Sequence, residues 1–102
     1  MAEGATIRLD LFLWFARIAK TRSAAQAIAE KGTLRLDGRR IERSAAPVRV
    51  GSIIVFASRG QVQALRVEAL PRRRGPPAEA AALYTPLEIQ APKAVDGAGA
   101  EA

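Results

Sequence analysis

The side chains of this sequence that could bind another molecule are mostly arginines, and many of them gather at two places along the chain. Lys20, Thr21, Arg22 and Gln26 surround the expected start of a helix. Free backbone N–H groups and the positive end of the helix dipole favour a phosphate there. The other candidates precede that junction, follow the helix or flank a later turn: Arg8, Lys31, Arg35, Arg39 and Arg40. These cations suit contacts with phosphates rather than recognition of particular bases.

The composition narrows the chemistry further. The 102 residues include 16 Lys and Arg against 10 Asp and Glu, a net charge of +6, and no Cys or His. This sequence therefore cannot form a disulfide framework, a Cys/His zinc site or a Ser-His-Asp relay. The charge is uneven, because residues 1–74 carry +9 and residues 75–102 carry −3. A basic body the size of one small domain indicates a polyanionic partner, usually a nucleic acid.

Three other functions are compatible with part of these observations. A DNA-binding protein could use two helices joined by a turn, but the second helix here is short and rich in alanine. An enzyme would need a reactive group or paired carboxylates in a cleft, and we expect no catalytic residue, no cofactor and no metal. An adaptor that docks through its Ala-rich helix would not conflict with RNA binding.

Two short helices are expected at the start of the chain. The apolar spacing predicts a first helix from residue 8 or 9 to residue 19 or 20. Trp14 and Phe15 fall outside its apolar stripe, so they either pack against another element or stack on bases. Thr21 is a suitable N-cap for a second helix over 22–31, and Gly32 suits the position after its end. Three apolar residues of this second helix are expected to face inward: Ala24, Ala27 and Ile28.

After these helices the hydrophobic period changes to that of a strand. Four strands are expected, over residues 33–36, starting with residues 39–41, over 52–57 and over 61–70. Asp37-Gly38 is a strong signal for a tight turn that joins the first two strands into a hairpin. In the last strand the apolar residues change phase, and a bulge near Leu65 would reconcile them.

The rest of the chain is expected to be less regular. Pro71 stops the last strand, Arg72, Arg73 and Arg74 begin a basic linker, and a short helix follows over 78–84. The expected division is a flexible start over 1–6, a core domain over 7–58, a packed C-terminal strand, linker and helix over 59–88, and a disordered tail over 89–102. The apolar run near residues 9–19 is too short and too charged to span a membrane, so a cytoplasmic protein is expected.

Several residues stand in a characteristic order and spacing over residues 7–57: Arg8-Leu9-Asp10, Leu13, Lys20-Thr21-Arg22, Ala27, Ile28, Gly32, Asp37-Gly38, Pro47, Gly51 and Ile53. This set resembles the S4 RNA-binding domain. The resemblance implies an α+β, S4-like (alpha-L) fold. In such a fold two packed N-terminal helices lie on a small four- to five-stranded antiparallel or mixed sheet, here with a short C-terminal helix added.

Three segments extend the likeness over residues 7–88: Arg-Leu-Asp-x-x-Leu-Trp-x-x-Arg at 8–17, the arginines at 72–74, and Glu-Ala-Ala-x-Leu-Tyr at 79–84. This pattern is similar to the ribosome-associated heat-shock protein 15 family. The resemblance implies a non-enzymatic protein that binds ribosomal RNA of the large subunit, or the complex in which a stalled large subunit still holds a nascent chain on transfer RNA, or both. Such binding would serve recovery from translation stress. It also favours Arg72, Arg73 and Arg74 as a secondary RNA contact, and we expect a monomer.

Some of these candidates have a structural alternative. Arg8 and Asp10 could form a structural pair or a helix cap. The others could be merely solvated: Arg22, Gln26, Arg39, Arg40 and the linker 72–74. The sequence also departs from the family pattern. Thr21 stands where most of the wider family has Ser, and the long basic C-terminal extension of the heat-shock family contrasts with the −3 of residues 75–102.

Overall fold

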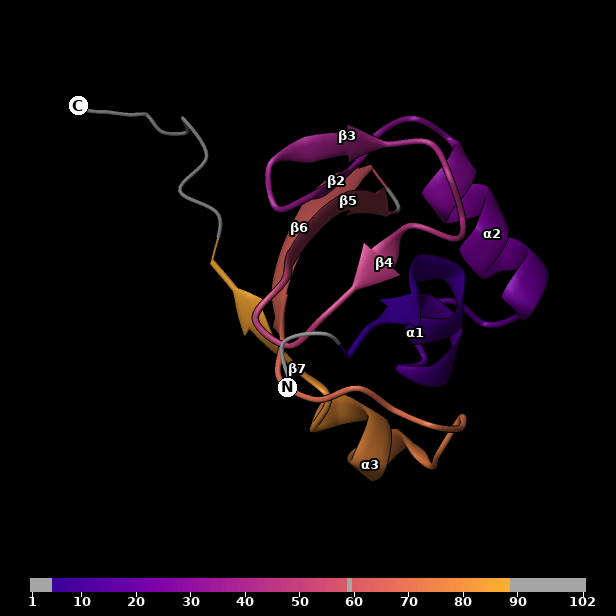
Figure 1. Ribbon diagram of the computed structural model, residues 1–102, viewed down its shortest axis with the longest axis vertical. Coiled ribbons are helices and arrows are strands. Elements are labelled where there is room, and N and C mark those ends of the chain that lie inside the picture. Colours follow the sequence, from indigo (N-terminus) through magenta and orange to yellow (C-terminus); the bar gives the residue numbers. More distant parts are fainter. Residues whose placement is uncertain (1–4, 59, 89–102) are drawn as a thin grey trace.

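The computed structural model describes residues 5–58 and 60–88, and Figure 1 shows its helices and strands. The two N-terminal helices pack side by side against one face of a curved sheet, as predicted. The elements are, in chain order, β1 (Ile7–Arg8), α1 (Leu9–Phe15), α2 (Arg22–Glu30), β2 (Leu34–Leu36), β3 (Arg39–Ile41), β4 (Pro47–Val48), β5 (Ile53–Ser58), β6 (Gln61–Val67), α3 (Pro77–Ala81) and β7 (Tyr84–Leu87). Within the described ranges no helix is long and apolar enough to cross a membrane.

The main sheet has five strands in the order β3-β2-β5-β6-β7, and all of its neighbours are antiparallel. A separate two-stranded ribbon pairs β1 with β4. The α+β class, the paired helices, the five-stranded sheet and the short C-terminal helix are therefore confirmed. The sequence did not indicate the β1–β4 ribbon, because each of its strands has only two residues.

The core lies between helix α1 and the inner face of the sheet. Leu9, Phe12 and Leu13 of α1 are fully buried, as the predicted stripe requires. The strands contribute alternate residues to the same core: Leu34, Leu36, Ile54, Phe56, Leu65 and Val67. Because side chains of a strand alternate between its two faces, the residues between these point outward. Trp14 is only partly buried and packs at the edge of this core.

Helix α1 is shorter than predicted, because it ends at Phe15 instead of continuing to residue 19 or 20. Arg17 adopts a left-handed backbone conformation with φ of 60°, which an α-helix cannot accommodate. The N–H groups of Ile18 and Ala19 both donate to the Leu13 carbonyl and fold the chain back toward α2. Apolar spacing alone could not locate this end, because Ile18 and Ala19 continue an apolar pattern and still pack on the core.

Helix α2 begins at Arg22 as predicted, ends at Glu30, one residue before the predicted end, and presents a different face to the core. The Thr21 hydroxyl accepts a hydrogen bond of 3.0 Å from the Ala24 N–H, and Gly32 follows the helix with φ of 87°. The buried residues are Ala25 and Ala29, whereas Ala27 is exposed. The inward face assigned to Ala27 was therefore wrong. Alanine occupies so many positions of α2 that its apolar stripe has no unique direction.

Replacing Thr21 by alanine should lower the free energy of unfolding by about 1 kcal/mol, because the Ala24 N–H loses its acceptor. Urea unfolding followed by circular dichroism measures this change. Thr21→Ser keeps a hydroxyl cap and should unfold within about 0.5 kcal/mol of the parent. Equal stability of the alanine variant and the parent would mean that water caps the helix as well as Thr21 does.

The predicted hairpin between β2 and β3 is confirmed. Asp37 and Gly38 both have positive φ, at 53° and 85°, as a two-residue turn of the mirror-image type I class requires. Asp37 also accepts a hydrogen bond of 2.9 Å from the Ile53 N–H, which ties the turn to strand β5. The turn thereby fixes which residues of the hairpin face the core.

The C-terminal part of the described chain differs from its prediction in two respects. Strand β6 pairs with β5 in one continuous register from Gln61 to Arg66, so the bulge expected near Leu65 was wrong. The apolar residues changed phase in the sequence because Val62 is exposed rather than inward. The short helix α3 ends at Ala81, and Tyr84–Leu87 forms a further edge strand instead of continuing it. The expected disordered tail over 89–102 lies outside the described residues, as do residues 1–4 of the expected flexible start.

Two arginines attach this C-terminal segment to the end of α1. The Arg17 Nε donates to the Gly75 carbonyl at 2.7 Å. Arg74 donates from Nε to the Trp14 carbonyl at 3.1 Å, and from its terminal nitrogen to the Ala19 and Lys20 carbonyls at 3.5 and 3.4 Å. Its guanidinium also lies 5.9 Å from the centre of the Trp14 ring, within the range of a cation–π contact. Arg74 thus holds the loop between the two helices in place.

Candidate nucleic-acid interface

A buried carboxylate organises the residues at the start of α1. Asp10 has an exposed fraction of 0%, and its two oxygens accept hydrogen bonds from the Arg8 guanidinium at 3.0 and 3.1 Å. One of these oxygens also accepts from the Leu11 N–H at 2.8 Å. The paired contact matches the planar fork of arginine to the two carboxylate oxygens and fixes the direction of Arg8. The structural role considered for Asp10 in the sequence is confirmed by these contacts.

Helix α2 brings two more predicted residues to the same carboxylate. The Arg22 guanidinium lies 3.7 Å from an Asp10 oxygen, and the Gln26 amide donates to that oxygen at 3.4 Å. Arg22 and Gln26 are one helical turn apart, so both project from one face of α2 toward α1. Arg8, Arg22 and Gln26, which are distant in sequence, therefore surround one side chain. We call them the Asp10 cluster.

The cluster keeps its central carboxylate charged. Burial alone would raise the pKa of Asp10, but the hydrogen bonds from Arg8, Gln26 and the Leu11 N–H outweigh burial and hold its pKa below the ordinary value of 3.8. The side chains of Arg8 and Arg22 remain 45% and 44% exposed. Each guanidinium therefore has one side held by Asp10 and enough exposed surface to contact a ligand phosphate.

The remaining N-terminal candidates lie around this cluster without joining it. Lys20 and Thr21 are exposed in the short loop before α2, next to Arg22 in sequence, and Thr21 caps the helix. Lys31 is exposed at the opposite end of α2. The nine residues of α2 span about 13 Å. Lys20 can therefore share a phosphate strand with Arg22, whereas Lys31 stands at a separate position.

The hairpin separates its arginines between two faces of the sheet. Arg35 and Arg40 are directly opposite each other across β2 and β3, and Arg40 pairs with Glu42 at 2.7 Å. Arg39 is opposite Leu36 and shares its face, which is the face that the helices cover. The structure therefore does not bring Arg35 and Arg40 together with Arg39. Because like charges across a strand pair repel, Arg35 and Arg40 would both gain from a bound anion.

Arg39 lines a groove that the sequence did not indicate. The groove has a volume of about 510 Å³. Its walls are Leu36, Asp37, Arg39, Ile41, Arg43, Ala46, Pro47 and Arg49. We call it the arginine groove. Arg43 and Arg49 were not among the sequence candidates, because they flank the stretch 44–47, which was expected to be a plain loop. Recognising that Pro47 and Val48 pair with β1 would have placed both arginines beside the start of α1.

The three arginines of the basic linker also differ in where their side chains lie. Arg72 and Arg73 are exposed, and Arg73 pairs with Glu79 at 3.0 Å. Arg74 instead donates its hydrogen bonds to the carbonyls of Trp14, Ala19 and Lys20. Of the three predicted secondary contacts, Arg72 and Arg73 therefore present their guanidiniums to solvent, while Arg74 acts on the loop that carries Lys20.

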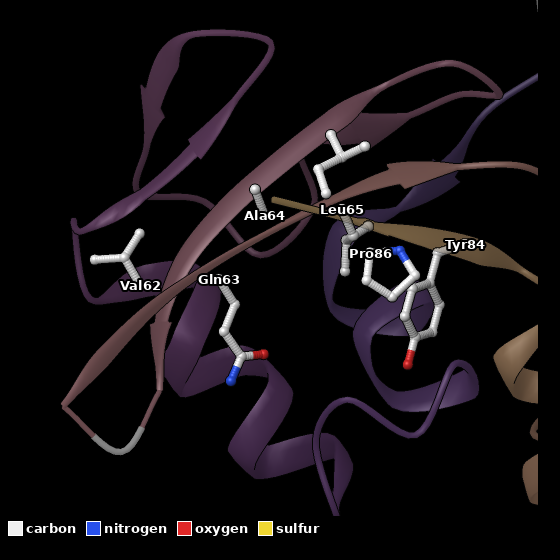
Figure 2. Close-up of a pocket in the computed structure, with 7 residues that line it drawn as sticks. Val62, Gln63, Ala64, Leu65, Tyr84 and Pro86 are labelled. Atoms are coloured by element: carbon white, nitrogen blue, oxygen red, sulfur yellow. The ribbon is translucent and has the colours of Figure 1, made fainter. Parts of the chain in front are cut away.

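Another hollow of the structure has a different character. It lies against β6 and β7, and Val62, Gln63, Ala64, Leu65, Tyr84, Pro86 and Leu87 line it. Figure 2 shows these side chains along the two strands, with the Gln63 amide and the Tyr84 hydroxyl among the polar groups. None of its lining residues carries a charge, so this hollow offers no cation to a polyanion. In the described part of the chain, no group of three acidic side chains is placed to hold a metal ion.

Comparison with known proteins identifies similar chains. The S4 domain family matches residues 7–54. A heat shock protein 15 homolog of Haemophilus influenzae is 36% identical over 88 residues, which cover 85% of this chain and 66% of that protein. Heat shock protein 15 of Escherichia coli is 33% identical over 78 residues, which cover 76% of this chain and 58% of the relative. The chain thus spans less than two thirds of the length of these curated relatives.

A solved structure shows the same arrangement of elements. The trimeric structure of Vibrio cholerae heat shock protein 15 superposes with a TM-score of 0.75 at 30% sequence identity. The match covers 81% of this chain and 83% of the Vibrio chain. The structural likeness therefore covers more of the chain than residues 7–54, which the family pattern matches.

Proposed function

This chain belongs to the S4 domain family and is similar to heat shock protein 15, and from that premise we propose that it is a non-enzymatic protein that binds ribosomal RNA of the large subunit. RNA binding follows from the family. The large subunit, its stalled complex of nascent chain and transfer RNA, and recovery from translation stress are the finer proposal. A cytoplasmic location belongs to the same proposal, because the ribosome would be its partner.

The observation that carries this proposal is the Asp10 cluster. Two arginines from different elements are held by one buried carboxylate, so their guanidiniums are oriented before any ligand arrives. A ligand that binds pre-oriented groups loses less conformational freedom than one that must order flexible side chains. The cluster lies beside the N-terminus of α2 and the exposed Lys20, which add further positive potential. The surface favours phosphate contacts over base recognition.

Binding to purified large subunits should fall at least about 100-fold between about 50 and 200 mM salt, since at least about four phosphate contacts release their counterions. The contacts counted are Arg8, Lys20, Arg22 and Arg39. Sedimentation of the protein with large subunits, small subunits and whole ribosomes at both salt concentrations measures this change. Movement with large subunits at low salt supports the proposal, and movement with small subunits alone would contradict it.

Competitor nucleic acids extend the same experiment. A folded RNA should displace the protein from subunits at a lower concentration than duplex DNA of equal length. Equal competition by duplex DNA would favour the alternative function, a general nucleic-acid binding module without ribosome specificity. The protein sedimented alone tests the expected monomer, and a threefold mass would show that it assembles like the trimer described for the Vibrio relative.

A further inference from the structure

The arginine groove has positive charge that the protein itself does not balance. Between residues 35 and 49 the sequence has five arginines against Asp37 and Glu42. Glu42 pairs with Arg40, on the other face of the hairpin, and Asp37 accepts the Ile53 N–H. Within residues 5–58 and 60–88, none of the salt bridges involves Arg39, Arg43 or Arg49. The lining of the groove therefore contains three guanidiniums and only one carboxylate, that of Asp37.

The composition of the groove selects the part of a nucleic acid that could occupy it. Half of its lining residues are apolar: Leu36, Ile41, Ala46 and Pro47. Its lining contains no aromatic ring on which a base could stack. The arginines could bind two phosphates of the backbone, and the apolar side chains between them could contact the sugar that joins these phosphates. Such a site would bind the backbone and be indifferent to sequence.

The groove lies next to the Asp10 cluster across the β1–β4 ribbon. Pro47 lines the groove and is directly opposite Arg8 in that ribbon. The Ala46 carbonyl, also at the groove, accepts a hydrogen bond of 2.9 Å from the Leu9 N–H, and the Ser44 carbonyl accepts one of 3.0 Å from the Asp10 N–H. The segment 44–47 therefore lies between the two basic sites and is hydrogen-bonded to the start of α1.

We propose that the arginine groove is a second phosphate-binding site, in which Arg39, Arg43 and Arg49 hold the sugar–phosphate backbone of the RNA that also contacts Arg8 and Arg22. This inference rests on the proposed RNA binding and extends it. The RNA strand passes over the β1–β4 ribbon and contacts one basic site on each side. The two sites together give the protein a longer footprint than the helices alone could offer.

The double variant Arg43→Gln/Arg49→Gln tests this site without touching the Asp10 cluster. Its affinity for a folded RNA should fall about 40-fold at about 100 mM salt, and the slope of log affinity against log salt should decrease by about 1.4 to 1.8. Fluorescence anisotropy over a range of salt concentrations gives both numbers. The variant Arg43→Lys/Arg49→Lys retains the charge and should keep most of the salt slope.

The matched controls are single variants. Arg66→Gln removes one charge from strand β6, where Arg66 pairs with Glu68, and should change RNA affinity less than about threefold. Arg43→Gln and Arg49→Gln should each exceed that change. Both arginines are exposed, so each variant should keep the circular dichroism spectrum and melting temperature of the parent.

The outcomes separate this inference from the function on which it rests. If the parent binds RNA, Arg22→Gln weakens binding and the double groove variant matches the parent in affinity and slope, the groove inference is overturned while RNA binding stands. If the parent binds no RNA, both fail. Equal binding of polyglutamate and RNA by the parent, lost in the double groove variant, would assign the groove to acidic peptides and overturn the RNA assignment.

Discussion

Replacing Arg22 and Arg39 together by glutamate is expected to lower affinity for folded RNA by about 1000-fold at about 100 mM salt. Each reversal removes one phosphate contact and adds a repulsion of similar size, and the counterion-release relation makes these losses multiply. Arg22 lies in the Asp10 cluster, and Arg39 lines the arginine groove. The double variant therefore disables both ends of the basic surface. Fluorescence anisotropy with several unrelated folded RNAs measures the effect.

The loss should be similar for every RNA tested, because neither side chain is placed to read bases. The single variants Arg22→Glu and Arg39→Glu should each lose a part of the affinity, and Arg66→Glu on β6 serves as the control of equal charge change. If the double variant loses no more affinity than Arg66→Glu, the RNA surface is not the one described. A loss confined to one RNA would mean that these arginines recognise sequence.

Replacing Asp10 by alanine is expected to lower the free energy of unfolding by about 3 kcal/mol. The substitution removes the acceptor of the Leu11 N–H and leaves Arg8 without its paired contact. This loss is at the lower end of the range for breaking a buried ion pair, because the Arg8 and Arg22 side chains remain nearly half exposed and water can solvate them. Urea unfolding measures the change. Glu42→Ala, which breaks the exposed pair with Arg40, should cost less than about 0.5 kcal/mol.

The same variant should bind RNA about tenfold more weakly at about 100 mM salt, although its net charge rises by one. Free guanidiniums would have to be ordered by the ligand, at a cost of about 0.5–1.5 kcal/mol for each side chain. Tighter binding by Asp10→Ala would show that the carboxylate merely opposes the phosphates. The two explanations predict opposite changes in RNA affinity. One titration therefore shows whether Asp10 acts by orienting the arginines or only by its negative charge.

The pKa of Asp10 also gives this variant a signature in its pH dependence. Because the folded protein holds that pKa below 3.8, Asp10 stabilises the fold fully above the unfolded value and loses this contribution as pH falls through the folded pKa. The stability difference between the parent and Asp10→Ala should therefore be constant at neutral pH and shrink below about pH 4. The sequence has no histidine, so no side chain with an ordinary pKa near 6.5 complicates the comparison.

Local signals in the sequence were sufficient for the parts of the fold that short segments determine. Thr21 caps α2 through its own hydroxyl, and Asp37-Gly38 forms its turn because both residues tolerate positive φ. The end of α1 at Phe15 was not predictable in this way. It depends on the backbone of Arg17, whose side chain is held by Gly75, 58 residues away. Strand β7 likewise forms because β6 offers it an edge, since Pro86 interrupts a strand signal of only two residues, Tyr84 and Thr85.

In the candidate site, too, the sequence predicted what neighbouring residues determine and missed what depends on distant ones. The cations of the α1–α2 junction were recognised because they cluster in sequence, and the structure adds the reason for their orientation, which is the buried Asp10. Arg43 and Arg49 could not be recognised, because their common groove exists only after β4 pairs with β1. Conversely, Arg39 and Arg40 are adjacent in sequence but project from opposite faces of a strand. The RNA contacts of all these residues remain predictions.

The position of Arg74 has a consequence for optical measurements on this protein. Trp14 is the only tryptophan in the sequence, and the Arg74 guanidinium lies 5.9 Å from the centre of its ring. The ring is only partly buried, so its emission depends on whether the segment after β6 stays docked against α1. Intrinsic fluorescence therefore reports local detachment of that segment, while circular dichroism follows the helices and the sheet. Two spectroscopic signals from an unlabelled chain can thus distinguish fraying at one end from unfolding of the whole.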